Sequence, residues 1–257
     1  MKPEVTIIKV GGDLLDDGPK FNEFIHAFST LQGRKILVHG GGKGASRLLK
    51  NLDIPVKYHE GRRITDEATL EVVIMVYAGQ INKKVVASLQ SIGVQAIGMA
   101  GCDGDLINAH KRVKGKLDFG YAGDIDYVNA SLINKLMEIG LVPVICPLTH
   151  DGEGQLLNTN ADTIASEIAQ SLIDHGSVNL HYCFGIKGVL GDINDQSSLV
   201  ENLDIQLMNS MLEEGSISEG MIPKLSNAFN AKENGVDHVT IGDHLHFIQE
   251  SGYTEVQ

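Results

Sequence analysis

Three consecutive glycines, Gly40 to Gly42, stand between an apolar run and a segment whose apolar residues recur with helical spacing. The run that ends at Val38 is typical of a β-strand, and Ala45, Leu48 and Leu49 fall on one face of a following helix. Glycines let the backbone approach a ligand closely, and the free N–H groups at a helix N-terminus favour an anion. The unit predicts a phosphate or carboxylate site in an α/β fold. A tight βα turn without a ligand is the alternative.

Neither of the two familiar phosphate-loop patterns explains this turn. Gly40-x-Gly42-x-x-Ala45 satisfies the relaxed dinucleotide pattern, but its strand is the second of the chain, and no acidic residue stands at the end of a clear following strand. The Walker pattern fails because Gly44, and not Ser or Thr, follows Lys43. The predicted anion site is therefore of another kind.

Composition argues against several classes of partner. The 257 residues carry a formal net charge of −12, which disfavours a nucleic-acid or anionic-membrane partner. No signal peptide, membrane span, repeat or low-complexity tract is evident, and an odd number of widely spaced cysteines fits a reducing cytoplasm. We interpret Cys102, Cys146 and Cys183 as core residues. The expectation is a cytoplasmic protein that binds a small anion.

Two lysines occupy positions that lysine seldom takes without an anion nearby. Lys9 lies at the C-terminal end of an apolar strand, where α/β sheets bind ligands. Lys224 follows Pro223 in the first turn of a predicted helix, where a cation opposes the helix dipole. Both ammonium groups are predicted to face phosphate. For each, a lysine exposed at an edge or on the surface is the alternative.

Two further stretches carry candidate ligand-binding side chains. At least one of the adjacent Arg62 and Arg63 is a candidate carboxylate clamp, because a guanidinium grips a carboxylate with two parallel hydrogen bonds; plain surface charge is the alternative. Asn158, Asn160 and Asp162 alternate before an amphipathic helix, which predicts an extended segment with three polar tips on one side. In the competing interpretation Asp162 is only the N-cap of that helix.

The rest of the pattern alternates strands with helices. Strands are predicted at residues 95–99, 142–145, 179–184 and 236–241, and helices at 20–31, 130–140 and from Pro223 to about 234. A helix capped by Thr65 or Asp66 should run toward Asn82, and residues 111–126 should form an exposed hairpin or flap. The chain is expected to end in a short tail. Its pair His244 and His246 is interpreted as incidental rather than as a metal site.

The motifs, taken in order, resemble those of the N-acetylglutamate kinases of the amino-acid-kinase family. Their order and spacing match over nearly the whole chain. The matching segments are Ile8–Gly12, Val38–Gly42, Gly61–Thr65, Asn82–Lys83, Asn158–Asp162 and Gly220–Lys224.

The resemblance implies a three-layer α/β/α sandwich on an open, mainly parallel sheet of about eight strands. Residues 1–178 would form an N-terminal lobe that binds the acylamino acid and dimerises, and residues 179–257 a C-terminal lobe that binds ATP. The implied reaction is ATP-dependent phosphorylation of the γ-carboxylate of N-acetyl-L-glutamate, the second step of arginine biosynthesis. It implies a cytoplasmic homodimer with no nucleic-acid or membrane partner. Mg²⁺ would be carried by the ATP phosphates, with no protein ligand assigned.

The resemblance also implies a role for each matching residue. Lys9 and Lys224 would stabilise the phosphoryl group in transfer, and Asp162 would hold these lysines in position. Arg63 and Asn158 would clamp the acylglutamate, with Arg63 on its α-carboxylate. Substrate-binding residues would also include Gly41, Gly42 and Asn160. Residues that bind phosphate and nucleotide would be Gly11, Gly12, Gly185, Ile186, Lys187, Gly188, Val189, Leu190, Ser216, Ile217 and Ser218.

The chain departs from the family pattern where relatives usually carry a Ser/Thr-Asp pair. It has Phe184-Gly185 there, with Lys187 near the turn, so side-chain contacts to the nucleotide are lost. Arg62 stands where relatives commonly carry an apolar residue, and the extra carboxylate of N-succinyl-L-glutamate would want another cation. If Arg62→Leu left the succinyl-to-acetyl preference unchanged, Arg62 would not be the discriminator.

Three alternatives to the acetylglutamate kinase therefore stay open at this point. One is an N-succinyl-L-glutamate kinase. Another is a carbamate, uridylate or aspartate kinase of the same superfamily. The third is a nucleotide or amino-acid sensor of the same fold that has lost turnover.

Overall fold

One eight-stranded sheet forms the centre of the molecule. The computed structural model describes residues 3–59, 61–115, 117–192, 194–217 and 220–257. The strand order is β12–β14–β13–β11–β1–β2–β8–β5, and every neighbouring pair is parallel except β13–β14. The strands are β1 (Glu4–Val10), β2 (Arg34–His39), β5 (Ala96–Met99), β8 (Val142–Ile145), β11 (Ser177–Cys183), β12 (Asn202–Leu203), β13 (His238–Gly242) and β14 (Thr254–Val256). The predicted open, mainly parallel sheet of about eight strands is confirmed.

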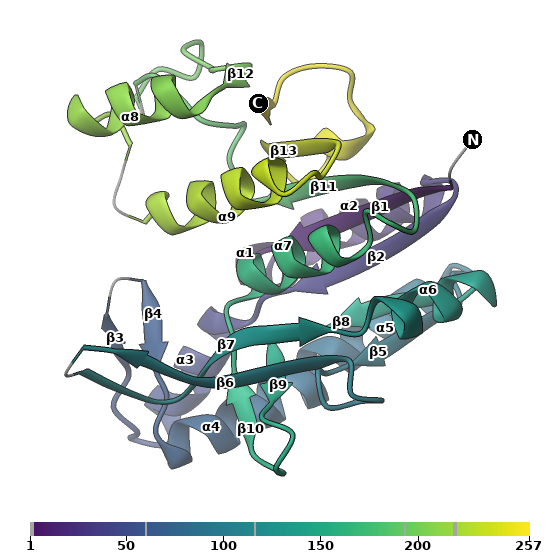
Figure 1. The fold of residues 1–257 in the computed structure, drawn as a ribbon, viewed down its shortest axis with the longest axis vertical. Coiled ribbons are helices and arrows are strands. Elements are labelled where there is room, and N and C mark those ends of the chain that lie inside the picture. The colour runs from purple at the N-terminus through teal and green to yellow at the C-terminus, as the bar shows by residue number, and fades with distance from the viewer. Residues whose placement is uncertain (1–2, 60, 116, 193, 218–219) are drawn as a thin grey trace.

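Helices cover both faces of this sheet and complete three layers (Figure 1). One face carries α1 (Gly12–Asp16), α2 (Gly18–Thr30) and α5 (Asn82–Ser91), and the other carries α6 (Ala130–Glu138), α7 (Ala161–Ser171) and α9 (Ile222–Glu233). Ile7 and Ile8 of β1 point to opposite faces, and both are fully buried. Burial stabilises each such side chain by about 1.5–3 kcal/mol, so a strand apolar on both sides needs a helical layer on each.

Smaller sheets lie beside the carboxyl ends of β1 and β2. The hairpin of β6 (Ile107–Lys114) and β7 (Leu117–Val128) closes a small barrel with β9 (Leu148–His150) and β10 (Leu156–Asn158). A second hairpin pairs β3 (Lys57–His59) with β4 (Arg62–Ile64), and Thr65 ties it to β7, because its carbonyl accepts from the N–H of Tyr121 at 2.7 Å. The hairpin predicted at residues 111–126 is confirmed, with longer strands, and in Figure 1 it lies beside β3 and β4.

The remaining helices connect these sheets. They are α3 (Gly42–Asn51), α4 (Glu67–Ile74), the π-helix η1 (Met75–Ile81), α8 (Ile205–Glu213) and the short 3₁₀ helix η2 (His246–Ile248). Asp66 caps α4 by accepting from the N–H of Thr69 at 2.9 Å, as one of the two predicted caps. By length and composition alone the continuous helix over residues 67–91 could cross a membrane, but Val73 and Val76 are buried in the core.

Three local expectations are wrong. The C-terminal residues form more than a tail, since β14 pairs with both β13 and β12. Cys102 is exposed, whereas Cys146 and Cys183 are buried as expected. Asn160, not Asp162, caps α7, and its side chain accepts from the N–H groups of Asp162 and Thr163. Asp162 therefore lies in the first helical turn rather than in an extended segment.

Lys35 is a buried lysine with a purely structural environment. Its ammonium donates to the carbonyl oxygens of Phe28, Ser29 and Leu31 at 3.0, 3.0 and 2.8 Å, at the C-terminal end of α2. Lys35→Met is therefore expected to lower the free energy of unfolding by about 1–3 kcal/mol, measured by urea denaturation. The exposed Lys50→Met is the control, and a Lys35→Met protein as stable as this control would contradict the prediction.

Two buried histidines should make stability depend on pH. His39 and His246 each donate Nδ1–H to a backbone carbonyl and accept at Nε2, from Asn82 and Thr240 respectively, so each ring is neutral. Burial is the main cause that lowers the pKa of each from 6.5 to about 4. Between pH 4 and pH 6.5 the unfolded chain therefore binds more protons than the folded chain. The stability that these rings contribute is full above pH 6.5 and is lost as the pH falls toward 4.

We expect the free energy of unfolding to drop by about 2–4 kcal/mol between pH 7.5 and pH 5. Urea denaturation at the two pH values measures this drop. Replacing the exposed His26 by Gln should leave it unchanged. Burial also lowers the pKa of His181 to about 3, so this ring adds to the drop. Equal stability at both pH values would show that these rings are not held neutral.

Candidate active site

Two glycine turns meet at the carboxyl ends of β1 and β2. The N–H of Gly40 donates to the carbonyl of Val10 at 2.9 Å, and α1 and α3 begin at Gly12 and Gly42. A Cβ on Gly41 would lie 2.7 Å from ring atoms of Tyr77, so no larger residue fits there without displacing that ring. The predicted strand–turn–helix unit is confirmed, and a second one stands beside it. Backbone N–H groups and two helix N-termini thus gather at one place, which suits an anion.

Lys9 and Asp162 form an ion pair next to these turns. Lys9 comes from β1 and Asp162 from the first turn of α7, and their exposed fractions are 5% and 7%. Lys9 Nζ contacts Asp162 Oδ1, so the buried ammonium has a buried partner charge. The end of α7 is held in place by the Asn160 cap and by Tyr182, whose hydroxyl donates to the carbonyl of Asp162 at 3.0 Å.

Lys224 approaches the same place from α9, which packs against α7. It lies in the first turn of α9, which begins at Ile222, and it lines a cavity together with Lys9, Gly11 and Gly12. Burial and then the charge of Lys9 lower its pKa, while Asp162 and Asp13 raise it. Two ammonium groups from distant segments therefore share one cavity, an arrangement that favours a polyanionic ligand.

Arg63 is held in a fixed orientation through Nη2, while Nη1 has no partner among the described residues. Its Nη2 donates to the carbonyl of Gly42 at 2.9 Å, to Ser46 Oγ at 2.8 Å and to the hydroxyl of Tyr58 at 2.5 Å. The side chain is 7% exposed, and Nη1 is buried without a hydrogen-bond partner among the described residues. A buried, unpaired N–H group of a charged side chain is costly, so Nη1 is expected to meet a carboxylate when a ligand binds.

Asn158 presents a defined face to the same cavity. Thr65 donates its hydroxyl to the carbonyl of Arg63 at 3.1 Å and must therefore accept from Asn158 Nδ2 at 3.0 Å. This assignment leaves Asn158 Oδ1 to accept a hydrogen bond. The side chain can thus recognise an N–H donor such as an amide.

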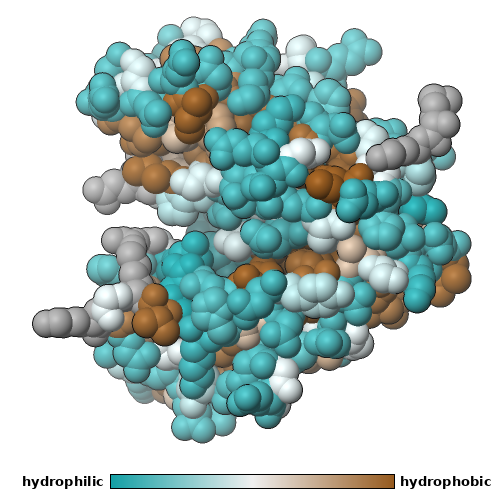
Figure 2. Space-filling view, in the orientation of Figure 1, coloured by the Kyte–Doolittle hydropathy of each residue, from teal (hydrophilic) through white to brown (hydrophobic). Residues whose placement is uncertain are grey.

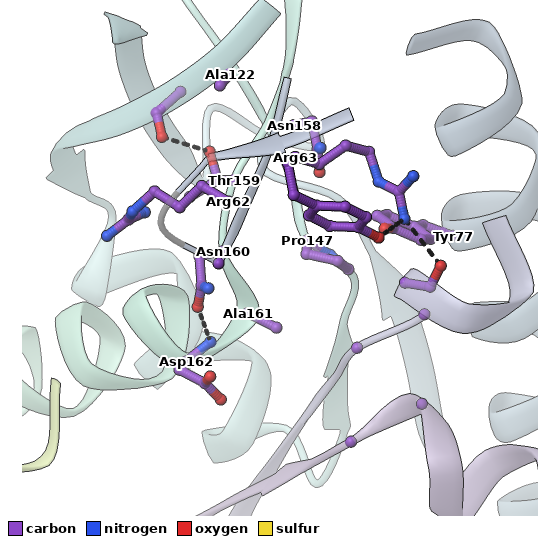
Figure 3. A pocket seen from close by; sticks show the side chains of 18 of the residues that line it. Arg62, Arg63, Tyr77, Ala122, Pro147, Asn158, Thr159, Asn160, Ala161 and Asp162 are labelled. Carbon is purple, nitrogen blue, oxygen red and sulfur yellow. Dashed lines mark hydrogen bonds between the residues drawn. The ribbon is translucent and has the colours of Figure 1, made fainter. Parts of the chain in front are cut away.

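These groups line a cavity of about 240 Å³ (Figure 3). Of the residues predicted for the acceptor and phosphate sites, the cavity brings together Lys9, Gly11, Gly12, Gly41, Gly42, Arg63, Asn158, Asn160 and Asp162. Arg62 also lines it, and so does Arg112, whose guanidinium is paired with the carboxylate of Asp124. The cavity is therefore rich in cationic and N–H donor groups and fits a small dicarboxylate.

Two further cavities carry the remaining predicted residues. The second, of about 530 Å³, shares Lys9, Gly11 and Gly12 with the first and adds Lys224. The third, of about 360 Å³, is lined by Gly185, Ile186, Lys187, Gly188, Val189, Leu190, Gln196, Ser216, Ile217 and Met221. Ser218 lies outside the described residues. In the space-filling view the surface is hollowed between the part with α8 and α9 and the part with β3, β4, β6 and β7 (Figure 2).

Several lining residues were not predicted. Tyr58 lies opposite Arg63 in the β3–β4 hairpin, and the Arg63 guanidinium carbon lies 4.8 Å from its ring centroid. Tyr77 was expected only in the apolar stripe of its helix, but η1, a π-helix, brings it against the glycine turn. Arg112 and Thr159 come from the small barrel. For Tyr58 the sequence offers one local signal: a turn at Gly61 would place residues 58 and 63 opposite each other in a hairpin.

Comparisons with known proteins agree with this architecture. A model of the amino acid kinase family matches residues 4–243. The chain is 48% identical over 241 residues to an acetylglutamate kinase of Phocaeicola vulgatus, with 94% of each covered, and 46% identical over 241 residues to one of Bacteroides fragilis, with 94% of this chain and 92% of that protein covered. A Streptococcus mutans protein of known structure aligns with a TM-score of 0.80 at 26% identity over 98% of each chain. From the sheet topology, the matched model and these relatives together, the chain belongs to the amino acid kinase family.

Proposed function

We propose that this protein transfers the terminal phosphoryl group of ATP to the γ-carboxylate of N-acetyl-L-glutamate, which forms an acyl phosphate in arginine biosynthesis. One cavity carries the proposal: its walls hold both glycine turns, the Lys9–Asp162 pair and the buried Nη1 of Arg63, which has no partner in the described part of the chain. Relatives described as acetylglutamate kinases support the acetyl acceptor, and they do not favour the succinyl acceptor or the sensor.

The acceptor would be fixed by three contacts. Arg63 Nη1 would bind the α-carboxylate, and Asn158 Oδ1 would accept from the amide N–H of the acyl group. The N–H groups of the turn at Gly41 and Gly42 would bind the γ-carboxylate beside Lys9. Such positioning supplies much of the rate enhancement when two reactants must meet in line.

The chemistry needs charge stabilisation and no general base. A γ-carboxylate is already ionised at neutral pH, with an ordinary pKa near 4.3, so no proton has to be removed. Lys9 and Lys224 would stabilise the negative charge on the oxygens of the phosphoryl group in transfer, and Asp162 would hold Lys9 in position. The N–H groups of Gly11 and Gly12 would contact the same phosphates.

The nucleotide would occupy the second and third cavities. Its phosphates would lie near Lys224, and its base and ribose along Gly185 to Leu190 and near Ser216 and Ile217. Among the described residues no group of three or more His, Cys, Asp or Glu side chains could hold a metal ion. Mg²⁺ would be carried by the ATP phosphates, where it would neutralise part of their charge.

Formation of the acyl phosphate, trapped as a hydroxamate, tests this proposal. The assay uses Mg-ATP with N-acetyl-L-glutamate, N-succinyl-L-glutamate, L-glutamate or L-aspartate as separate acceptors. Turnover with N-acetyl-L-glutamate in preference to the others is the expected result. Preference for the succinyl compound would make N-succinyl-L-glutamate the acceptor in place of the acetyl compound. ATP binding without turnover of any acceptor would support the sensor.

We also propose that residues 1–178 and 179–257 act as acceptor and nucleotide lobes of a cytoplasmic homodimer. The proposed boundary falls within β11, which joins β1 to β13. Free cysteines fit a reducing compartment, and the exposed Leu52 and Met75 offer apolar surface on the first lobe. Size-exclusion chromatography with light scattering would test the dimer, and a monomer at assay concentration would exclude it.

A further inference from the structure

The ring of Phe184 lies beneath both lysines of the proposed phosphate site. Lys224 Nζ is 4.2 Å from the ring centroid, and Lys9 Nζ is 4.8 Å from it. Both distances are within the range in which the negative face of an aromatic ring attracts a cation. The sequence comparison with the family treated Phe184-Gly185 as a loss of polar contacts. The structure instead shows an aromatic ring in contact with the two cations.

The ring is held in place from below. Phe184 stacks on Tyr182, with 5.3 Å between ring centroids and 21° between ring planes. The two residues are two positions apart in the chain, so they project to the same side of β11 and its continuation. Tyr182 is fully buried, and its hydroxyl donates to the carbonyl of Asp162. The stack therefore connects the ring to the same helix turn that pairs with Lys9.

Lys224 has few other means of stabilising its charge. Among the described residues no carboxylate lies within ion-pair distance of its ammonium, whereas Lys9 is paired with Asp162. Two like charges close to one cavity repel each other, and burial lowers the pKa of Lys224. An aromatic face lowers this cost without accepting a conventional hydrogen bond. The Lys224 ammonium keeps its N–H donors for oxygens of a phosphoryl group, which a carboxylate at the position of the ring would compete for.

We propose that Phe184 is a positioning residue, whose ring holds Lys9 and Lys224 together in the charged form at the place where the phosphoryl group is transferred. This inference rests on the proposed kinase function. It gives Phe184, which stands where relatives usually carry part of a Ser/Thr-Asp pair, a role in the site. The ring acts on the lysines, and Phe184 lines the second cavity and not the proposed acceptor cavity.

The test compares variants that keep or remove the ring. Phe184→Tyr keeps the aromatic face, Phe184→Leu and Phe184→Met keep apolar bulk without it, and Phe28→Leu is the matched control. Phe28 is fully buried, and its ring centroid lies 5.2 Å from Lys35 Nζ, so the control removes a ring next to a lysine that is not in the site. Each variant is assayed with Mg-ATP and N-acetyl-L-glutamate, and its melting temperature is measured.

Loss of the ring should lower kcat by roughly 5- to 30-fold, because two contacts of this kind are removed. The KM for the acceptor, which Arg63 is proposed to determine, should stay within about 2-fold. Phe184→Tyr should retain kcat within about 3-fold, and Phe28→Leu should change the melting temperature without changing kcat. Turnover by the wild-type protein tests the proposed function, and only the comparison of variants tests the role of Phe184. The two proposals can therefore fail independently.

A second readout does not need turnover. Nuclear magnetic resonance titration of the Lys224 ammonium, assigned with Lys224→Arg, gives its pKa in the free protein. Groups that face Lys224 are Lys9, Asp162 and Asp13, and burial and Lys9 already lower this pKa. Removal of the ring should lower it further, and the alkaline limb of the kcat profile should move to lower pH.

Three results would overturn the inference. One is a kcat in Phe184→Leu or Phe184→Met equal to that of wild type. Another is a loss in Phe184→Tyr as large as in the leucine variant, which would indicate sensitivity to shape alone. The third is a lowered kcat with an unchanged Lys224 pKa, which would leave only a packing role.

Discussion

Replacement of Lys9 by methionine should lower kcat by about 10²–10³-fold, the largest effect expected in this protein. Methionine keeps most of the stem volume but removes the charge that would meet the phosphoryl oxygens. It also leaves Asp162 buried without its partner, so the free energy of unfolding should fall as well. Hydroxamate formation under saturating Mg-ATP and acceptor measures kcat, and circular dichroism shows whether the variant is folded.

Lys35→Met is the matched control for this prediction. Lys35 belongs to β2, the strand next to β1, and it is buried to a similar degree, at 8% exposed against 5% for Lys9. Its ammonium caps a helix end and lies outside the cavities of the site. The control should therefore lose stability but keep kcat. Equal kcat in the two variants would show that Lys9 does not take part in phosphoryl transfer.

Replacement of Arg63 by alanine should lower kcat/KM for the acceptor by roughly 30- to 1,000-fold, with most of the change in KM. The expected cost is about 2–4 kcal/mol, because the α-carboxylate would lose a charged, buried partner. The KM for ATP should change little, since Arg63 lines the proposed acceptor cavity and not the two cavities proposed for the nucleotide. Initial rates with each substrate varied in turn measure these constants.

Two variants separate charge from geometry at this position. Arg63→Lys keeps the charge but not the planar fork, so it should recover only part of the loss. Arg47→Ala removes an exposed arginine of α3, which pairs at 3.4 Å with Asp16 on the surface, and it should leave KM unchanged. An unchanged acceptor KM in Arg63→Ala would mean that another group binds the α-carboxylate. The neighbouring Arg62 would then be the residue to test.

Local chemistry made several parts of the site predictable. Lys9 in an apolar strand and Lys224 in the first turn of a helix each conflict with their own surroundings, so each one points to an anion. The glycine run between a strand and a helix likewise has few interpretations. The roles of these residues stay predictions until variants are assayed, but the structure places them around connected cavities.

Other features depend on contacts between distant segments. Asp162 looked like an N-cap or part of an extended segment, because only the folded chain shows that Asn160 takes the cap and frees Asp162 for Lys9. Tyr77 reaches the glycine turn because a π-helix changes the periodicity of its helix. The hydrophobic pattern of the sequence does not predict that π-helix. The pairing of β14 with β13 depends on a return of the chain that local propensity does not specify.

By itself the sequence determined the alternation of strands and helices, the glycine turn and the identity of the cations, because strand and helix periodicity, backbone freedom and charge are local properties. The three-layer arrangement was implied by the family resemblance. The family resemblance implied that Asp162 holds Lys9, and the structure shows that pair. Only the tertiary structure decided that Arg63 meets Tyr58 and that both site lysines meet Phe184. Those contacts join segments from different parts of the chain. Their energies arise from desolvation and partner geometry, which exist only once the core has closed.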